Sequence, residues 1–224
     1  MKLKLKKPGA YFMELLILIA GITISFMLNE WRTSRTMSDE QARIIAQLKT
    51  DLQRDTALAH QQLKFMEQTR EAAISLLKSE EPKPLGDYRS DIAIMVNTVS
   101  QRFASSTFIE LESTGKLGLI EDDNLRGRLI SYYTAAQPAI YEWHEIDKSQ
   151  YLPMITNYMN TSVPFSLNYN FAAFSPEDSV KFIQSIQADE FKHIVQFNVI
   201  IKSGVGMHCQ ALLSEAEALL QAIE

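Results

Sequence analysis

The strongest constraint on this chain is an uninterrupted apolar stretch near its N-terminus, residues 10–28, which reads AYFMELLILIAGITISFML. Its only charged residue is Glu14. A helix of this length covers roughly 28 Å at about 1.5 Å per residue, close to the hydrocarbon thickness of a bilayer. Tyr11 and Phe12 lie at one end and Trp31 follows the other, where interfacial aromatic residues are expected. We therefore predict that residues 10–31 form a transmembrane anchor in the lipid bilayer.

A cleaved signal peptide is the alternative interpretation of this stretch. The apolar run is long for the hydrophobic region of a signal peptide, and no small-x-small cleavage motif separates it from the charged residues that come after it. We therefore expect a retained, single-pass anchor. Four lysines precede the span (Lys2, Lys4, Lys6 and Lys7), and three arginines come after it (Arg32, Arg35 and Arg43). The positive-inside rule then predicts a basic cytoplasmic tail over residues 1–9 and an exported domain over residues 32–224.

Two features of the predicted span exceed what anchoring alone requires. Glu14 lies one turn inside the apolar run, where a charge is costly unless it is paired, protonated or near the interface. It is either an interfacial residue in the first helical turn or a contact or proton-handling site that faces another helix. Gly21 and Ser25 form a small-xxx-small pair that would let two helices approach closely. Together with Asn29 and Trp31, these residues are our candidate transmembrane interaction site.

The overall charge of the chain excludes one class of partner. The net charge is −5, and it becomes −9 once the four lysines of the tail are set aside. Nucleic-acid binding requires clustered Lys and Arg, and no such stripe is present, so we expect no nucleic-acid partner. The single Cys209 excludes an intrachain disulfide and is expected to be a small buried apolar residue.

The rest of the chain has helical periodicity. Apolar residues recur at a three-to-four spacing from Ile45 to Leu76, which predicts a long amphipathic helix better than a self-sufficient coiled coil, because Asp55, Gln62 and Thr69 interrupt the pattern. We expect this helix to be capped at Ser38 and to end at the Pro- and Gly-containing residues 81–86. Further helices are predicted over residues 88–104, from a cap at Asp122 or Asp123, and over 141–159 with a kink at Pro153, Pro138 bending or restarting the chain before it.

The C-terminal third contains the best loop and the last helix. Residues 160–176 form the loop, and its aromatic residues suggest that it is packed down (Phe165, Tyr169, Phe171 and Phe174). Ser175 and Pro176 open another helix, and a long helix is predicted over 189–223, with a kink or a close helix contact at Gly204 and Gly206. We find no repeat and no period-two run long enough to demand a sheet. The fold class is therefore all-α: one N-terminal transmembrane helix, then a bundle whose long first and last helices pack together.

Residues capable of chemistry are few. Glu190 and His193 share a helix face, as in di-iron bundles, but no second Glu-x-x-His pair exists, and Glu142, His144 and Glu145 are the only other cluster. We predict no metal site, no cofactor and no catalytic residue. Aromatic residues are concentrated in residues 132–158, and they line either a ligand pocket or the core; the candidate pocket residues are Tyr132, Tyr133, Tyr141 and Trp143.

Two stretches resemble an uncharacterised bacterial family of single-span membrane proteins, a domain of unknown function. The first runs from Glu14 through the Gly21-Ile22 step to Asn29 and Trp31, and continues with Leu48-x-x-Asp51-Leu52-x-x-Asp55. The second is LESTGKLGLI at residues 111–120, continuing to residues 132–133. The chain departs from the family pattern at residues 26–27 and at residue 30. The resemblance covers the first quarter and a mid-chain block; it implies an architecture and no catalytic residues, and it draws attention to Glu14 and Gly115.

These observations favour a non-enzymatic, membrane-anchored helical protein that acts by assembling with itself or with other membrane proteins. An exported ligand-binding sensor bundle is the first alternative, and its basis is the aromatic group at residues 132–158. A stator-like, proton-coupled subunit that uses Glu14 is the second. The sensor interpretation is weakened because only a seven-residue tail would remain on the other side of the membrane to transmit a signal. Assembly is the leading prediction because of the anchor, the long helix and the missing catalytic constellation.

Overall fold

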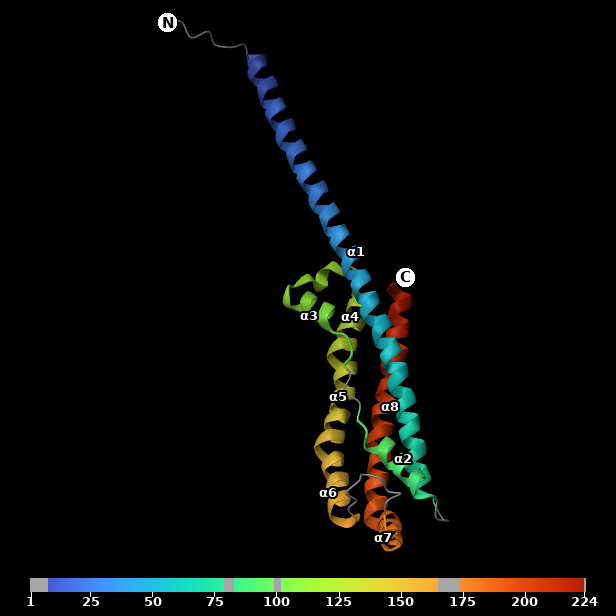
Figure 1. Cartoon of the computed structure of the whole chain (residues 1–224). Helices are drawn as coiled ribbons and strands as arrows, with labels where there is room; N and C mark the ends of the chain where they lie inside the picture. The colour runs from blue at the N-terminus through green and yellow to red at the C-terminus, as the bar shows by residue number, and fades with distance from the viewer. Residues whose placement is uncertain (1–7, 79–82, 99–101, 165–173, 224) are drawn as a thin grey trace.

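The computed structural model describes residues 8–78, 83–98, 102–164 and 174–223, and within these ranges the chain is helical and has no β-strand. Figure 1 shows one helix that projects far beyond a bundle formed by the others. The helical elements are α1 (Pro8–Leu77), α2 (Leu85–Val96), α3 (Ser106–Ser113), the 3₁₀ turn η1 (Lys116–Leu119), α4 (Asp123–Ser131), the π-helical turn η2 (Tyr132–Ala136), α5 (Gln137–Ile146), the π-helical turn η3 (Asp147–Tyr151), α6 (Leu152–Ser162), α7 (Pro176–Gln187) and α8 (Asp189–Ile223). The predicted all-α fold is confirmed.

Helix α1 is continuous through the point where a new helix was expected to begin. It contains 70 residues, which corresponds to about 105 Å of helix. The predicted cap at Ser38 is wrong, because residues 29–40 contain no Gly or Pro and continue the helix that begins in the apolar segment. The apolar segment and the first core helix are therefore one rigid element.

The long first and last helices pack together, as predicted. α8 lies antiparallel beside the C-terminal half of α1 (Figure 1). Most buried α1 side chains alternate three and four positions apart, and the polar interruptions are part of this pattern: Leu48, Leu52, Asp55, Ala59, Gln62, Met66, Thr69, Ala73 and Leu76. Ile44 and Ala72 are buried as well. α8 buries residues at the same spacing. The contact is thus coiled-coil-like, and three polar side chains of α1 are buried along the same side of the helix.

The segment from α4 to α6 is one long helix with two π-helical turns, and the predicted restart at Pro138 and kink at Pro153 are replaced by these turns. Each turn ends just before Gln137-Pro138 or Leu152-Pro153. The amide N–H of Gln137 donates to the carbonyl of Tyr132, five residues back, and that of Leu152 donates in the same way to Asp147. A proline lacks an N–H and clashes with the carbonyl of residue i−4, so widening the preceding turn accommodates it without ending the helix.

Helix α2 is shorter than expected, and the remaining boundaries obey local signals. α2 ends at Val96, and Asn97 is extended, so the predicted helix over 88–104 is wrong in its second half.

Gly115 adopts a left-handed conformation with φ of 68° and closes the turn after α3. The Asp122 side chain caps α4 by accepting from the N–H groups of Asn124 and Leu125. Ser175 caps α7 as predicted. Of the loop aromatics, Phe174 packs on Phe182, and the other three lie outside the described residues.

A close helix contact occurs at Gly204. A Cβ atom built on Gly204 would lie 2.6 Å from Cδ2 of the Trp143 ring, whereas one on Gly206 would meet nothing closer than 3.9 Å. The indole of α5 therefore lies directly against the backbone of α8. Helix α8 stays one element through both glycines, so the expected close contact is confirmed at the first of them.

Candidate functional site

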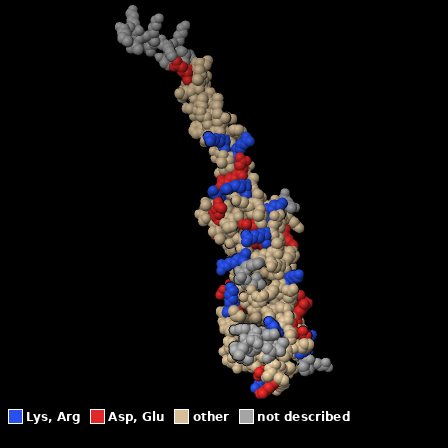
Figure 2. All heavy atoms as spheres, viewed as in Figure 1, with Lys and Arg blue, Asp and Glu red and all other residues tan. Residues whose placement is uncertain are grey.

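The N-terminal part of α1 is apolar and lies outside the bundle. Every described side chain from Phe12 to Asp39 is exposed, and the exposed fraction reaches 71% for Phe26. In Figure 2 this arm is almost entirely tan between the acidic residue near its start and the charged residues near the bundle. It is the one helix in the described part of the chain that is long and apolar enough, by length and composition, to cross a membrane.

The candidate interaction residues of this arm do not all share one face. At about 100° per residue, Glu14, Gly21 and Ser25 lie within roughly 40° of one another, whereas Trp31 points to another side. Gly21 lies in a shallow hollow lined by Ile17, Leu18, Gly21, Ile22, Ser25, Phe26 and Asn29. A Cβ on Gly21 would meet no atom within 4 Å, so the surface of the hollow is open. The hollow face of the arm is therefore open and contacts no other part of the described chain.

The hydroxyl groups in the arm are satisfied within the helix itself. The Oγ of Ser25 donates to the carbonyl of Gly21 at 2.9 Å, and the Oγ1 of Thr23 donates to that of Ile19 at 2.9 Å. This bonding lowers the cost of placing hydroxyls in hydrocarbon, where unsatisfied polar groups cost several kcal/mol. Beyond the apolar run, the Arg35 guanidinium lies 5.7 Å from the Trp31 ring, in a cation–π contact.

The bundle first touches α1 through the turn after α3. The Nζ of Lys116 donates to Oε1 of Glu40 at 2.6 Å, and Ile44 is the first buried residue of α1. Gly115, which the family resemblance singled out, forms the bend that brings Lys116 to this position. A groove separates the exposed helix from the turn, lined by Asn29, Glu30, Thr33, Ser34, Met37, Ser38, Gln41, Gly118, Leu119 and Glu121.

Inside the bundle, Asp55 is fully buried at a junction of four chain segments. Its Oδ1 accepts from the N–H of Ala104 at 2.6 Å, and its Oδ2 accepts from the hydroxyl of Tyr132 and from Nε2 of Gln137, both at 2.9 Å. Burial raises the pKa of Asp55 to about 6; the three hydrogen bonds oppose this rise, and the nearby Asp51 carboxylate adds to it. Asp55 thereby fastens the segment between α2 and α3 onto α1 and η2.

The four candidate pocket residues are packed side chains. Tyr132 is fully buried and bonded to Asp55, and burial raises the pKa of Tyr132 above its ordinary value. The Tyr133 ring stacks on Phe108 at 4.6 Å between centroids. The hydroxyl of Tyr141 accepts from the N–H of Phe103 at 2.9 Å. Three of the four surround the Asp55 junction, whereas Trp143 lies apart from it and packs against Gly204 of α8.

A second buried polar cluster lies at the other π-helical turn, η3. The Nζ of Lys202 on α8 donates to Oδ2 of Asp147 in η3 at 2.5 Å, and the two side chains are 3% and 2% exposed. Burial and the Lys202 charge lower the pKa of the neighbouring His144, which favours its neutral form. Tyr151 lies in the same cluster, and burial raises the pKa of Tyr151. This buried ion pair links α8 to η3, because each charged side chain would be left without a partner if the two helices slid past each other.

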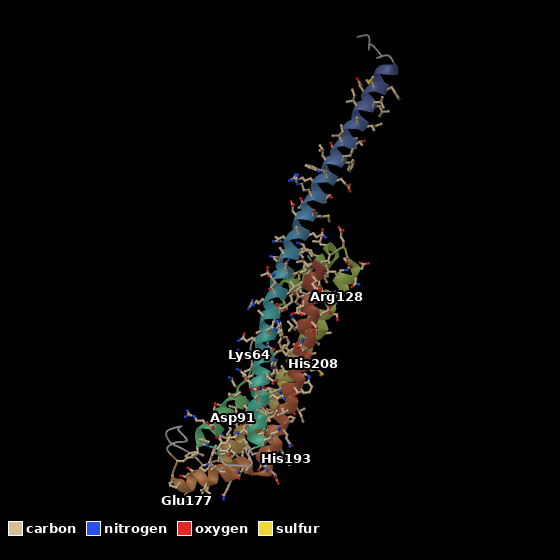
Figure 3. All side chains as sticks on the ribbon, turned by 90° about the vertical axis from the view of Figure 1, so that its right-hand side faces the viewer. Lys64, Asp91, Arg128, Glu177, His193 and His208 are labelled. Atoms are coloured by element: carbon tan, nitrogen blue, oxygen red, sulfur yellow. The ribbon has the colours of Figure 1, made fainter. Side chains whose placement is uncertain are left out.

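The remaining candidates for chemistry are dispersed. Glu190 and His193 are both exposed near the start of α8 (Figure 3), and Glu142 and Glu145 are exposed whereas His144 is buried. Within the described ranges, no three His, Cys, Asp or Glu side chains are grouped closely enough to hold a metal ion. Cys209 is buried as predicted, and burial raises the pKa of its thiol to about 11.

Sequence reasoning missed the buried polar residues Asp55, Gln137, Asp147 and Lys202. The sequence did contain a signal for Gln137 and Asp147, because both lie close before a proline within a helical pattern. Gln137 directly precedes Pro138, and Asp147 lies six residues before Pro153. A proline inside a helical pattern marks a local disturbance of the helix, and π-helical turns are frequent at functional sites. For Asp55 the signal was its position in the three-four pattern, which places it on the buried side of α1.

Comparison of the chain with protein-family models, with curated proteins and with solved structures gave no match in any of the three. The resemblance to a single-span membrane family therefore stays a prediction from the residues themselves. The arguments for a function come from the geometry of the arm and the bundle.

Proposed function

We propose that this chain is a membrane-anchored helical protein that assembles with itself or with other membrane proteins and has no catalytic activity of its own. Its apolar arm would cross the bacterial inner membrane once. Its tail would be cytoplasmic and its bundle periplasmic, as the distribution of Lys and Arg around the arm favours. The proposal concerns architecture and assembly, the two properties for which the molecule provides physical arguments.

The observation that carries this proposal is the continuity of α1. An apolar arm without any buried side chain runs unbroken into the seam that holds the bundle together. A removable leader has a short apolar region followed by a small-residue cleavage site, whereas here the long apolar run passes directly into residues 29–43, which have no such site and are helical. In water the arm would expose a contiguous apolar surface far larger than soluble monomers carry, which supports its placement in lipid.

Membrane insertion is tested with the full chain in native membranes. We expect alkaline carbonate extraction to leave the protein in the membrane pellet, and a periplasm-active reporter fused to the C-terminus to be active. Release by carbonate would contradict the anchor, and activity of a cytoplasm-active reporter in its place would contradict the orientation.

Assembly through the anchor is tested by cysteine cross-linking across the arm. Gly21→Cys and Ser25→Cys lie on the hollow face, whereas Thr23→Cys lies about 180° from it and is the matched control. Native Cys209 can stay in place, because burial raises the pKa of its thiol and suppresses the thiolate. We expect oxidation to give cross-linked species at the first two positions and not at the third; equal yields would count against a specific helix contact.

A proton-coupled role for Glu14 is the second candidate, because Glu14 shares the face of Gly21 and Ser25. If this role holds, Glu14→Gln reproduces the membrane phenotype of a deletion strain while the cross-linking pattern persists. Glu14→Asp is the control that keeps the carboxyl group. A wild-type phenotype in Glu14→Gln would remove this candidate.

A further inference from the structure

The outward face of α8 lacks exposed charged side chains for most of its length. Its exposed positions between residues 196 and 214 are Gln196, Ile200, Ser203, Met207, Gln210, Ala211 and Ser214, which we call the neutral face. The only Lys, Arg, Asp or Glu between residues 196 and 214 is Lys202, which is buried against Asp147. The face extends over about 27 Å of helix.

The other long helices have charged outer faces. α1, which lies beside α8, exposes Arg54, Lys64, Glu67, Arg70 and Glu71. Figure 3 labels Lys64 on α1 and His208 on the adjacent α8. The helix formed by α4–α6 exposes two glutamates of α5 and Lys148 of η3. A surface helix normally places charged residues opposite its buried stripe, so the neutral face departs from the rule that the rest of the bundle obeys.

The neutral face also has the spacing of a helix-packing seam. Apart from Ala211, its residues alternate four and three positions apart, which is the heptad pattern of coiled coils. Ile200 and Met207 lie one heptad apart and are 59% and 64% exposed. The residues around them, Ser203, Gly206 and Ala211, are small. Two large apolar side chains are therefore exposed among small, uncharged residues.

We propose that the neutral face packs in parallel against the same face of a second copy of this chain. This inference rests on the proposed membrane anchor, because copies inserted in one direction must be related by a two-fold axis along the membrane normal. In such a symmetric parallel contact each residue meets its own counterpart. Any charge on the contact would then oppose an identical charge, which destabilises it. Among the faces of the long helices, the neutral face satisfies this condition and the charged face of α1 does not.

The membrane also explains why a narrow contact suffices. Anchoring confines both copies to one plane and one orientation, so part of the entropic cost of association has already been met. A seam with two apolar residues per copy would be weak between freely diffusing domains. Between anchored copies it selects the partner and fixes the register.

The experiment uses full-length protein in native membranes and single added cysteines. Ile200→Cys, Met207→Cys and Gln210→Cys lie on the neutral face; Gln53→Cys, Gln61→Cys and Lys64→Cys lie on the outward face of α1 as matched controls. Disulfides form where Cβ atoms of two copies approach to about 4 Å, so we expect at least about fivefold more dimer from the first set than from the second. Similar yields from both sets, no dimer from the first set, or cross-links to a different protein would each overturn the inference.

A second variant tests the charge argument. Ser203→Glu places two carboxylates face to face and is expected to abolish the Met207→Cys dimer, whereas Ser203→Ala keeps it. Circular dichroism of the Ser203→Glu protein shows whether the bundle is intact, and an unaffected dimer would overturn the inference. Carbonate extraction separates the two proposals: protein released from the membrane contradicts both, and retained protein without dimer contradicts this one alone.

Discussion

Removing the charge of Asp55 should change how the stability of the bundle depends on pH. Burial raises the pKa of Asp55 from 3.8 to about 6, so the folded protein binds a proton more tightly than the unfolded chain does. The stabilisation that comes from the protonated carboxyl is complete below pH 3.8 and is lost as pH rises through 6. A shift of this size corresponds to about 3 kcal/mol in total, of which about 1.3 kcal/mol is lost between pH 5 and pH 7.

His144 acts in the opposite direction over the same pH range. Its pKa is lowered from 6.5 by burial and by Lys202, so the bundle loses stability as the pH falls below 6.5. The wild-type profile sums the two effects and can be nearly flat. The unfolding free energy of Asp55→Asn minus that of wild type reports the contribution of Asp55 alone, because the His144 contribution is the same in both proteins.

The assay is urea unfolding of detergent-solubilised full-length protein, monitored by circular dichroism at pH 5, 6 and 7. We expect the unfolding free energy of Asp55→Asn minus that of wild type to increase by about 1.3 kcal/mol from pH 5 to pH 7, whatever its absolute sign. Asp51→Asn should reduce this increase, because the Asp51 charge contributes to the raised pKa of Asp55. A difference that is constant or that falls with pH would refute the reasoning.

Three further predictions concern packing and can be tested by the same unfolding assay. Gly204→Ala should destabilise the bundle by about 1–3 kcal/mol, because its Cβ would overlap the indole ring, whereas Gly206→Ala should stabilise it by about 0.5–1 kcal/mol through helix propensity; the opposite order would contradict the observed contact. Lys202→Ala should lower the free energy of unfolding by about 3–5 kcal/mol, because it leaves Asp147 buried and unpaired. The double variant Lys202→Met with Asp147→Leu should regain most of this free energy, because it removes both buried charges. A double variant that stays destabilised would show that the ion pair stabilises the bundle by more than the cost of burying its two charges. Gly115→Ala should cost about 1–2 kcal/mol, because φ is 68° there, and an unchanged free energy of unfolding would mean that the turn can relax.

Local sequence signals predicted the caps at Asp122 and Ser175 and the bounds of α8, and they failed at several other helix ends. The Asp122 and Ser175 caps act through the next few residues, so the sequence alone was sufficient. Ser38 had the right residues for a cap, but nothing before it breaks the helix, so the chain continues helical through it. The second half of the predicted helix over 88–104 was wrong. There, Asp55 and Tyr141 bind the backbone of Ala104 and Phe103 and hold the segment away from α2.

The buried polar clusters could not have been assembled from the sequence. Asp55 bonds to Tyr132 and Gln137, which are 77 and 82 residues away, and Lys202 bonds to Asp147 across 55 residues. A pattern identifies which side of one helix is buried, but it does not say which residue of another helix lies opposite. That pairing depends on the crossing of α1, α8 and the helix with two π-helical turns.

The sequence by itself determined that this chain is helical, that its N-terminal stretch is apolar along its whole circumference, and that the first and last helices are long enough to pack on each other. These properties depend on periodicity and on composition over a window of residues, which are local quantities. Only the tertiary structure decided that the apolar arm and the bundle share one uninterrupted helix, that three of the aromatic candidates surround a buried carboxylate, and that one face of α8 remains exposed and uncharged. Those outcomes depend on which side chains meet across helices, and the free energy of burial is shared between residues that the sequence places far apart.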